Sequence, residues 1–264
     1  MRWNKISIVY MTNISITFPT KDKVISFIWQ HVLLLVSLFI MTLGVVLCVR
    51  SNLGSSVISS CPLAFTLAGA DGLVPALTLG TYTNILNCLL VAGQVLVLRR
   101  RFQPIQLLQL LIGFVFGAMI DMNMALTSQL ICDTLTSQLI TQMAGCTVMA
   151  VGIALEIRCG SITMPGEGLP AAISKATGKP FANIKIYIDV CLVILAVISG
   201  YLFFGRWMWN VVGVGTLFAM VYVGMMVKLI GKHLGWFDRL LYYHPGFRRY
   251  LYGLARFVNN KLSR

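Results

Sequence analysis

The chain has 264 residues, of which 58% are hydrophobic and 11% are charged, and its mean hydropathy is +0.83. Soluble domains carry about a quarter charged residues, so this composition excludes a soluble globular domain and predicts an all-α polytopic membrane protein. The formal net charge of +13 does not indicate nucleic-acid binding, because no soluble domain is left to present it. We expect the basic residues to set membrane orientation and to contact lipid.

Residues 1–23 are expected to form a cytoplasmic leader. They contain four basic residues, Arg2, Lys5, Lys21 and Lys23. They lack the compact apolar core and the small-residue cleavage site of a removable signal peptide. Met11 is an alternative start of the chain, and the sequence leaves this choice open.

Six uncharged runs are long enough, or nearly so, to cross a bilayer as helices, which takes about 17–25 residues. They are residues 24–49, 85–98, 102–120, 134–155, 190–205 and 207–227. The second and fifth runs reach the required length by including the polar residues 82–84 and 185–189. The sequence therefore predicts about six transmembrane helices.

The distribution of Lys and Arg predicts the orientation of these helices. If the N-terminus is cytoplasmic and the spans alternate, all 21 Lys and Arg except Arg50 and Arg206 lie on the cytoplasmic side. Residues 231–264 then form a basic cytoplasmic tail that mixes aromatic residues and Leu with Arg. We expect amphipathic helices on the anionic lipids of the inner leaflet, the alternative being a disordered tail.

The segment between the first two spans, residues 51–80, must begin and end outside if the three arginines at 99–101 are to stay inside. Within it, residues 55–70 are apolar, but about 16 residues of helix are too short for a core of about 30 Å. We expect a re-entrant half-helix that starts at Gly54, Ser55 and Ser56 and closes through a turn at residues 69–72.

Polar and small residues on the next two spans predict helix contacts. Asn84, Asn87 and Gln94 share one helical face, which we expect to look into the bundle and away from lipid. Gly113 and Gly117 form a small-xxx-small pair, which allows two helices to approach closely.

The second half of the chain repeats the first. Gly44 aligns with Gly152 and Arg50 aligns with Arg158. Further matches pair residues 58–59 with 173–174, 82–85 with 181–184, and 112–113 with 212–213. Each unit has three crossings and one broken segment, so the second copy must be inverted relative to the first. We expect repeat 1 at residues 24–126 and inverted repeat 2 at residues 134–230, with their interrupted helices meeting near the midplane.

The other segments are arranged around residues 151–178, where charged residues are concentrated in an otherwise apolar chain. Glycines and prolines break the second part of this stretch, so it cannot form one ordinary helix. Glu167 is expected in the first turn of a short helix, where an acid can serve as a structural cap. A charge at a re-entrant tip costs at least ~2.5–3.5 kcal/mol unless it is paired or hydrated, which favours a proton- or cation-coupling carboxylate.

Two further sets of residues are candidates for binding a solute. Ser55 and Ser56 lie at the tip that matches Glu167, where free N–H groups and hydroxyls predict either an anion cradle or an ordinary N-cap. Lys185 and Asp189 are four residues apart on one helix and are expected to neutralise each other, the alternative being direct contact with the solute.

Arg50, Asp121, Glu156 and Arg158 form a second tier of candidates. Asp121 is expected to end its helix. Glu156 and Arg158 point to different sides of one helix and cannot pair with each other. The two arginines are expected to anchor the topology, the alternative being ion pairs with Asp121 or Glu156 from neighbouring helices.

Several classes of site are not indicated. The seven cysteines are scattered singly, which predicts free thiols, and the three histidines are isolated, so nothing has the spacing of metal ligands. The chain has no nucleophile–base grouping, no phosphate-binding loop and no dinucleotide fingerprint. We therefore expect no cofactor and no enzymatic activity.

Six motifs and one charged pair carry a family resemblance. LGVVLCVRSNLGSS, GTYTN, RFQPIQLLQL, GFVFGAMID, GIALEIR and MPGEGL, together with Lys185 and Asp189, resemble the YczE/YyaS/YitT-like family of bacterial integral membrane proteins. The likeness covers residues 32–229, and its more specific parts are GIALEIR and residues 165–168. The resemblance implies a location in the bacterial inner membrane and implies no substrate.

The leading hypothesis is a secondary transporter for a small polar or anionic solute, with proton coupling as an option, gated by rocking of the two inverted repeats. Its expected site consists of Ser55, Ser56, Asn84, Asn87, Glu167, Lys185 and Asp189. One alternative is a membrane scaffold or regulatory protein that acts through its cytoplasmic tail. Another is a ligand-capturing subunit of a larger transporter. The sequence leaves the oligomeric state open.

Overall fold

The computed structural model describes residues 20–99, 102, 104–159 and 164–237, and these residues contain helices and no strand. The long helices are α2 (Thr20–Arg50), α4 (Leu79–Leu98), α5 (Leu108–Leu126), α6 (Leu135–Cys159), α8 (Phe181–Phe204) and α9 (Val214–His233). The short ones are α3 (Val57–Ala70), η2 (Pro104–Leu107) and α7 (Pro165–Thr177). Most of the expected leader and of the expected tail lie outside the described residues, and the last residues of the leader begin α2.

Within the described part of the chain, six helices are long and apolar enough to cross a membrane. They are the long helices named above, and α3 is a shorter apolar helix. The protein is therefore an all-α multi-pass membrane protein, as its composition predicts.

The fourth element begins later than predicted. The expected span at residues 102–120 lies at Leu108–Leu126, because Pro104 first opens the short η2 turn. Asp121 does not end this helix, and that prediction is wrong. Its carboxylate instead accepts hydrogen bonds from the Gly80 amide at 2.8 Å and the Thr78 hydroxyl at 2.7 Å, at the start of α4.

The last span is displaced in the same direction. The expected run at residues 207–227 lies at Val214–His233, so its first seven residues precede the helix. This segment folds back on itself, since the Trp207 indole donates a hydrogen bond to the Val212 carbonyl at 2.9 Å. Gly213 then occupies the N-cap position of α9.

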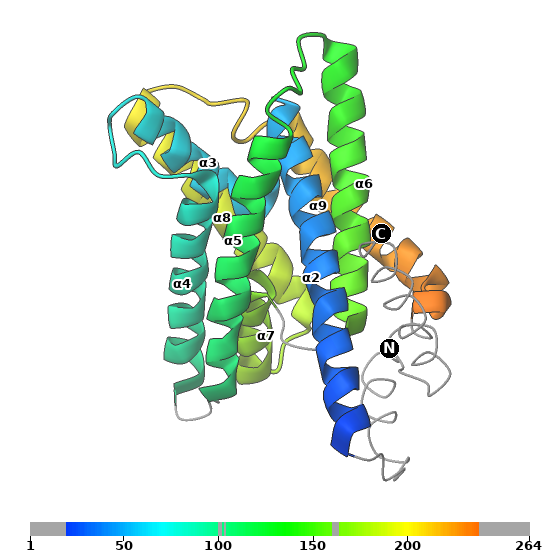
Figure 1. Ribbon diagram of the computed structural model, residues 1–264. Coiled ribbons are helices and arrows are strands. Elements are labelled where there is room, and N and C mark those ends of the chain that lie inside the picture. Colours follow the sequence, from blue (N-terminus) through cyan, green and yellow to red (C-terminus); the bar gives the residue numbers. More distant parts are fainter. Residues whose placement is uncertain (1–19, 100–101, 103, 160–163, 238–264) are drawn as a thin grey trace, which may run out of the picture.

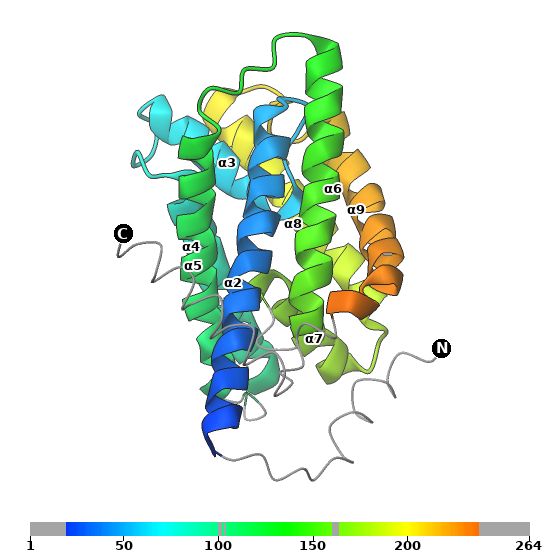
Figure 2. The same cartoon turned by 45° about the vertical axis from the view of Figure 1, so that its right-hand side comes forward.

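The helices of the two halves run in opposite directions along the bundle (Figure 1). In the first half α2 and α5 rise and α4 descends in this view, whereas in the second half α6 and α9 descend and α8 rises. The short helix α3 lies toward the end of the bundle where α2 finishes, and α7 lies toward the opposite end. Both views place α2 and α6 side by side along the bundle (Figure 2).

The short helices pack across the boundary between the halves. α3 packs mainly against α8 and also against α4, while α7 packs mainly against α4 and also against α8. The outer helix of each half lies against its own first helix, α5 on α2 and α9 on α6. The two halves are therefore interlocked by α3 and α7.

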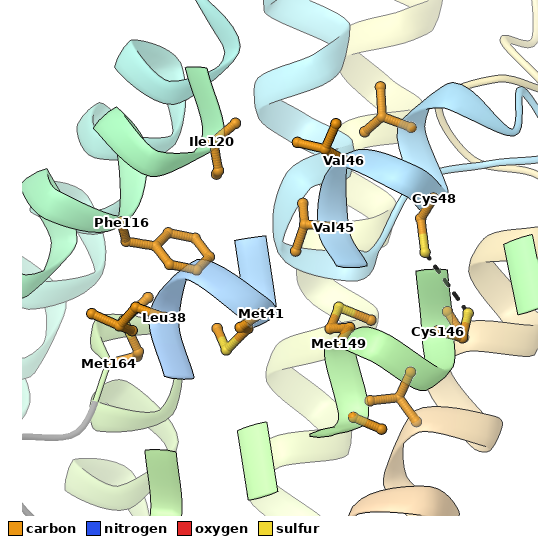
Figure 3. Close-up of a cluster of buried hydrophobic side chains, with 14 of the residues drawn as sticks. Leu38, Met41, Val45, Val46, Cys48, Phe116, Ile120, Cys146, Met149 and Met164 are labelled. Carbon is orange, nitrogen blue, oxygen red and sulfur yellow. Dashed lines mark hydrogen bonds between the residues drawn. The ribbon is translucent and has the colours of Figure 1, made fainter. Parts of the chain in front are cut away.

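Glycines bring α2 and α6 into close contact along the main apolar core (Figure 3). A Cβ at Gly44 would lie 2.3 Å from the Met149 nitrogen, and one at Gly152 would lie 2.5 Å from the Met41 nitrogen. Real Cβ atoms do not approach so closely, so only glycine permits this crossing. Cys48 and Cys146 lie at the same crossing, and all seven cysteines are free, as the sequence predicts.

The start of each short helix follows the repeat register. One interval along the chain separates Gly44 from Gly152, Arg50 from Arg158 and the first residue of α3 from that of α7. The same interval separates the prolines inside the two helices, Pro62 and Pro170. This register matches Ser59 with Glu167, so it replaces the alignment of residues 58–59 with residues 173–174.

Candidate functional site

The first turn of α7 receives its cap from another helix. Met164 is the N-cap residue of α7, and its amide donates a hydrogen bond at 3.3 Å to Oε1 of Glu156 on α6. Glu167, the third residue of α7, lies in that first turn and is half-buried. Carboxylates are favoured near the N–H groups at a helix start, and here two of them converge on one end.

Two glycines allow the first turn of α7 to touch three other helices. A Cβ at Gly166 would lie 2.5 Å from Cδ1 of Ile58, in the first turn of α3. A Cβ at Gly168 would lie 2.6 Å from Oε1 of Gln109 on α5 and 2.7 Å from Nε2 of Gln94 on α4. The starts of α3 and α7 therefore meet, and α4 and α5 close around the start of α7.

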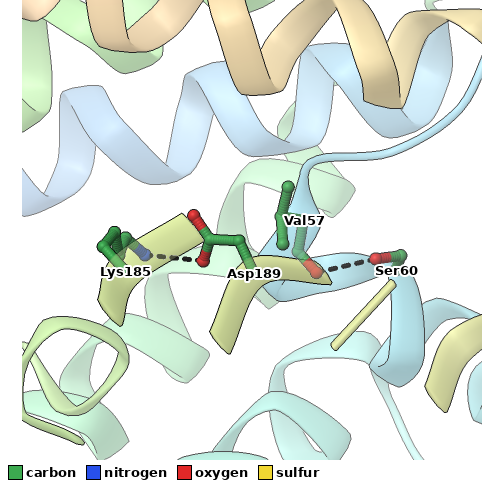
Figure 4. A network of polar contacts seen from close by, with 4 residues as sticks. All are labelled: Val57, Ser60, Lys185 and Asp189. Carbon is green, nitrogen blue, oxygen red and sulfur yellow. Dashed lines mark hydrogen bonds and ion pairs between the residues drawn. The ribbon is translucent and has the colours of Figure 1, made fainter. Parts of the chain in front are cut away.

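Lys185 and Asp189 complete the charged group. Their Nζ and Oδ1 atoms are 2.9 Å apart, so the predicted neutralisation along α8 is confirmed (Figure 4). Figure 4 also places this pair beside Val57 and Ser60 in the first turn of α3. Glu167 lies within electrostatic range of Lys185, Asp189 and Glu156.

An apolar cluster lies beside this charged group. Its buried members are Leu86 and Leu90 on α4 and Leu192 on α8. Val57, Ile58, Leu169 and Ile188, from α3, α7 and α8, pack against them. Charge interactions are stronger in such surroundings than in water, so the balance of three carboxyl groups against one ammonium group makes the site acidic.

Glu156 is more buried than the other acids of the group. Only 6% of its surface is exposed. Its Oε1 atom accepts from Met164, whereas Oε2 is buried and has no hydrogen-bond partner among the described residues. A buried acceptor without a partner is unusual in proteins, and it distinguishes Oε2 from the other carboxyl oxygens of this group.

The two serines of the predicted tip, Ser55 and Ser56, form hydrogen bonds within the chain. The Ser55 amide and hydroxyl both donate to the Val211 carbonyl, at 3.2 and 3.0 Å. Ser56 is the N-cap residue of α3, but its hydroxyl pairs with the Ser59 hydroxyl at 2.7 Å and not with the helix backbone. These donors are engaged, so the predicted anion cradle is not formed in this conformation.

Asn84 and Asn87 face α5 and not the acidic group. A Cβ at Gly117 would lie 2.3 Å from the Asn84 Oδ1 atom, and one at Gly113 would lie 3.2 Å from the Asn87 Nδ2 atom. Asn87 is 1% exposed, and both asparagines have buried amide atoms without a partner among the described residues. The seven predicted site residues are therefore divided among three places, and Glu167, Lys185 and Asp189 form one of them.

The second-tier arginines bind backbone carbonyls. Arg50 donates to the Met124 carbonyl at 2.8 Å, near the end of α5. Arg158 donates to the Gly231 carbonyl, near the end of α9. Asp121 is engaged at the start of α4, so the alternative ion pair between Arg50 and Asp121 is not formed. Each arginine thus ties the first helix of its half to the last.

The sequence did not identify Gln94 and Gln109 as a pair. Both are buried, and Nε2 of Gln94 donates to Oε1 of Gln109 at 3.1 Å. An uncharged polar residue inside a membrane span was the available signal, because such residues usually face a partner within the bundle. The sequence placed Gln94 on the correct face, but Gln109 stands close to the start of its span and gave little indication.

The described residues contain no group of three or more His, Cys, Asp and Glu placed to hold a metal ion. Glu156, Glu167 and Asp189 share one neighbourhood without forming such a group. A buried carboxyl group in this arrangement can exchange a proton, and the arrangement can interact with a polar or cationic solute. Its excess of carboxyl groups would repel an anion.

Comparison with known proteins identifies the family and no activity. The model of a family of unknown function, DUF6198, matches residues 28–232, and the chain belongs to this family. Comparisons with curated proteins and with solved structures give no match.

Proposed function

We propose that this member of the DUF6198 family is a secondary transporter for a small polar solute, working by alternating access of two inverted repeats. The observation that carries the proposal is the meeting of the first turns of α3 and α7, where Gly166 approaches Ile58. This contact lies beside the group formed by Glu167, Lys185 and Asp189, within a bundle of spanning helices. Interrupted helices that meet beside charged residues are typical of solute sites in such transporters.

Three features support the inverted repeats. The helices of the second half run opposite to those of the first (Figure 1). Gly44, Arg50 and Pro62 have counterparts at one constant interval along the chain. The short helix of each half packs mainly against a helix of the other half, α3 on α8 and α7 on α4. A movement of one half would therefore displace a helix of the other.

The acidic balance of the site favours a neutral or cationic solute over an anionic one. The carboxyl groups of Glu156, Glu167 and Asp189 lie in one neighbourhood with the Lys185 ammonium group, and Asp189 already pairs with it. An anion would enter against the remaining negative charge at low dielectric, which costs free energy.

Orientation and location are part of the proposal. The distribution of Lys and Arg supports cytoplasmic termini. The resemblance to the YczE/YyaS/YitT-like family supports a bacterial inner membrane, with the basic tail on anionic lipids. Labelling of single cysteines introduced at Asp71 and at Thr177 tests the orientation: the first should react from outside and the second from the cytoplasm.

Transport is tested with purified protein in proteoliposomes. A thermal-shift screen of amino acids, amines, sugars and organic acids first selects a solute, because binding to the native state raises its apparent stability. Uptake of that solute is then measured with and without a pH gradient. Glu167→Gln should remove the stimulation by the gradient, whereas Asp133→Asn, in an exposed loop, should leave it unchanged.

Two outcomes would contradict the proposal. Unchanged gradient-driven uptake in Glu167→Gln would remove Glu167 from the mechanism. Absence of uptake for every solute that binds would favour a scaffold or regulatory protein. In that case, removal of residues 238–264 should abolish whatever effect the protein has in cells.

A further inference from the structure

We propose that Glu156 binds a proton in this site and that its protonation controls the start of α7. The proposal rests on the proposed function for its role in transport. Binding of the proton is a separate property, which can be measured without any solute.

The geometry of Glu156 separates it from the other acids. It is 6% exposed, and its two carboxyl oxygens differ. Oε1 accepts the Met164 amide at 3.3 Å, while Oε2 is buried without a partner among the described residues. Ionised, this carboxyl group leaves a charged oxygen without compensation in an apolar interior. A proton on Oε2 removes that charge and converts the atom into a donor.

The carboxyl group of Glu167 lies within electrostatic range of Glu156. Lys185 and Asp189 on α8 act on Glu167 in turn, and Cys159 on α6 lies within the field of Glu156. Arg158 follows two residues after Glu156 on its own helix. At the same end of the bundle, α2 carries His31, and α9 carries Lys228, Lys232 and His233.

A proton fits this place better than a metal ion does. Metal ions such as Ca²⁺ need several oxygen ligands, and the described residues contain no group of three or more His, Cys, Asp and Glu placed to hold one. The Oε2 atom is enclosed, which leaves no opening to a hydrated ion. A single carboxyl oxygen without a hydrogen-bond partner is sufficient to bind one proton.

Protonation of Glu156 reaches α7 through the Met164 amide. A carboxylate accepts a stronger hydrogen bond than a neutral carboxyl group, so uptake of the proton loosens the cap on α7. The first turn of α7 also touches Ile58 on α3 and the Gln94–Gln109 pair. A change at the cap is thereby passed to α3, α4 and α5, which are parts of the other half.

The test is infrared difference spectroscopy of the purified full-length protein between low and high pH, with no solute present. The wild type should show a protonated-carboxyl band that disappears as the pH rises. Glu156→Gln keeps an oxygen acceptor for Met164 and cannot take up the proton, so it should lose this band. Glu167→Gln and Asp133→Asn should keep it, and Glu156→Asp should shift it.

Each outcome decides the proposal. Loss of the band in Glu156→Gln alone, with an unchanged circular dichroism spectrum, supports it. A band that persists in Glu156→Gln and disappears in Glu167→Gln overturns it in favour of Glu167, and a wild type without the band overturns it altogether. If proteoliposomes show no uptake while the band depends on Glu156, the proton site stands and the transport function fails.

Discussion

The two halves of the molecule contain matching helices but close them differently. In the first half α4 packs along α5, whereas α8 and α9 in the second half make no comparable contact. A Cβ at Gly117 on α5 would collide with Asn84, while a Cβ at Gly224 on α9 would meet nothing within 4 Å. The shares of buried residues are 39% and 33% in α4 and α5 but 22% in both α8 and α9.

A small hollow accompanies the looser packing of the second half. It lies between α8 and the segment before α9, and Gly200, Tyr201, Trp207 and Met208 are among the residues that line it. The corresponding place in the first half, between the end of α4 and the start of α5, is closed by the hydrogen bond from Gln94 to Gln109. The two halves thus differ in how closely their outer helices pack. Under the proposed function, exchange of these two arrangements would move access from one side to the other.

The largest expected effect distinguishes the two glycines. Gly117→Leu must displace Asn84 from the α4–α5 contact and should destabilise the protein by about 3 kcal/mol, as overpacking does. Gly224→Leu is the matched control. It faces open space and removes a helix glycine, so it should be neutral or stabilising by about 1 kcal/mol. Thermal unfolding in detergent measures both, and equal losses would show that α9 has a partner at this position.

The arginines should show where the halves are alike. Arg50→Met and Arg158→Met each remove a hydrogen bond from a charged donor to the last helix of their own half. Each should lower stability by about 1.5 kcal/mol, the lower range for such bonds. Arg50→Lys and Arg158→Lys serve as controls that keep the charge. If only one of the Met variants melts earlier, the two arginines do not have equivalent roles.

The smallest effect concerns the cap on α4. Asp121→Ala removes the acceptor of the Gly80 amide and should cost about 1 kcal/mol, as the loss of an N-cap does. Lys228→Ala, at an exposed position on α9, should leave the melting temperature unchanged. An unaffected Asp121→Ala variant would mean that water replaces the carboxylate. Closure of the first half would then depend on the other contacts between α4 and α5, such as Asn84 with Gly117 and Gln94 with Gln109.

Most of the fold was predictable because its signals are local. Runs of apolar residues located six spans, and the break between Gly160 and Pro170 located α7. The boundaries of α5 and α9 were misplaced by several residues. From sequence, a charged residue such as Asp121 indicates the end of a span. Its position inside α5 is explained only by the Gly80 amide at the start of α4, which donates a hydrogen bond to its carboxylate.

The candidate site was predictable only in part. Glu167 was expected in the first turn of a short helix, and Lys185 and Asp189 were expected to pair, since both features depend on residues close in sequence. The hydrogen bonds from the Ser55 hydroxyl to the Val211 carbonyl and from the Met164 amide to the Glu156 carboxyl group were not predicted. These contacts depend on how α6 and the segment before α9 are placed.

The sequence by itself determined the membrane class, the number of spans, the two broken segments and the free cysteines. Apolar length, glycine and proline breaks and isolated cysteines act within a few turns of chain, so no packing had to be known. Tertiary structure alone decided which polar groups of different helices face each other. It joined Arg50 to α5, Asn84 to Gly117 and Glu156 to the start of α7. The physical reason is that a hydrogen bond requires its two atoms to lie within about 3 Å, and only the packed helices set that distance.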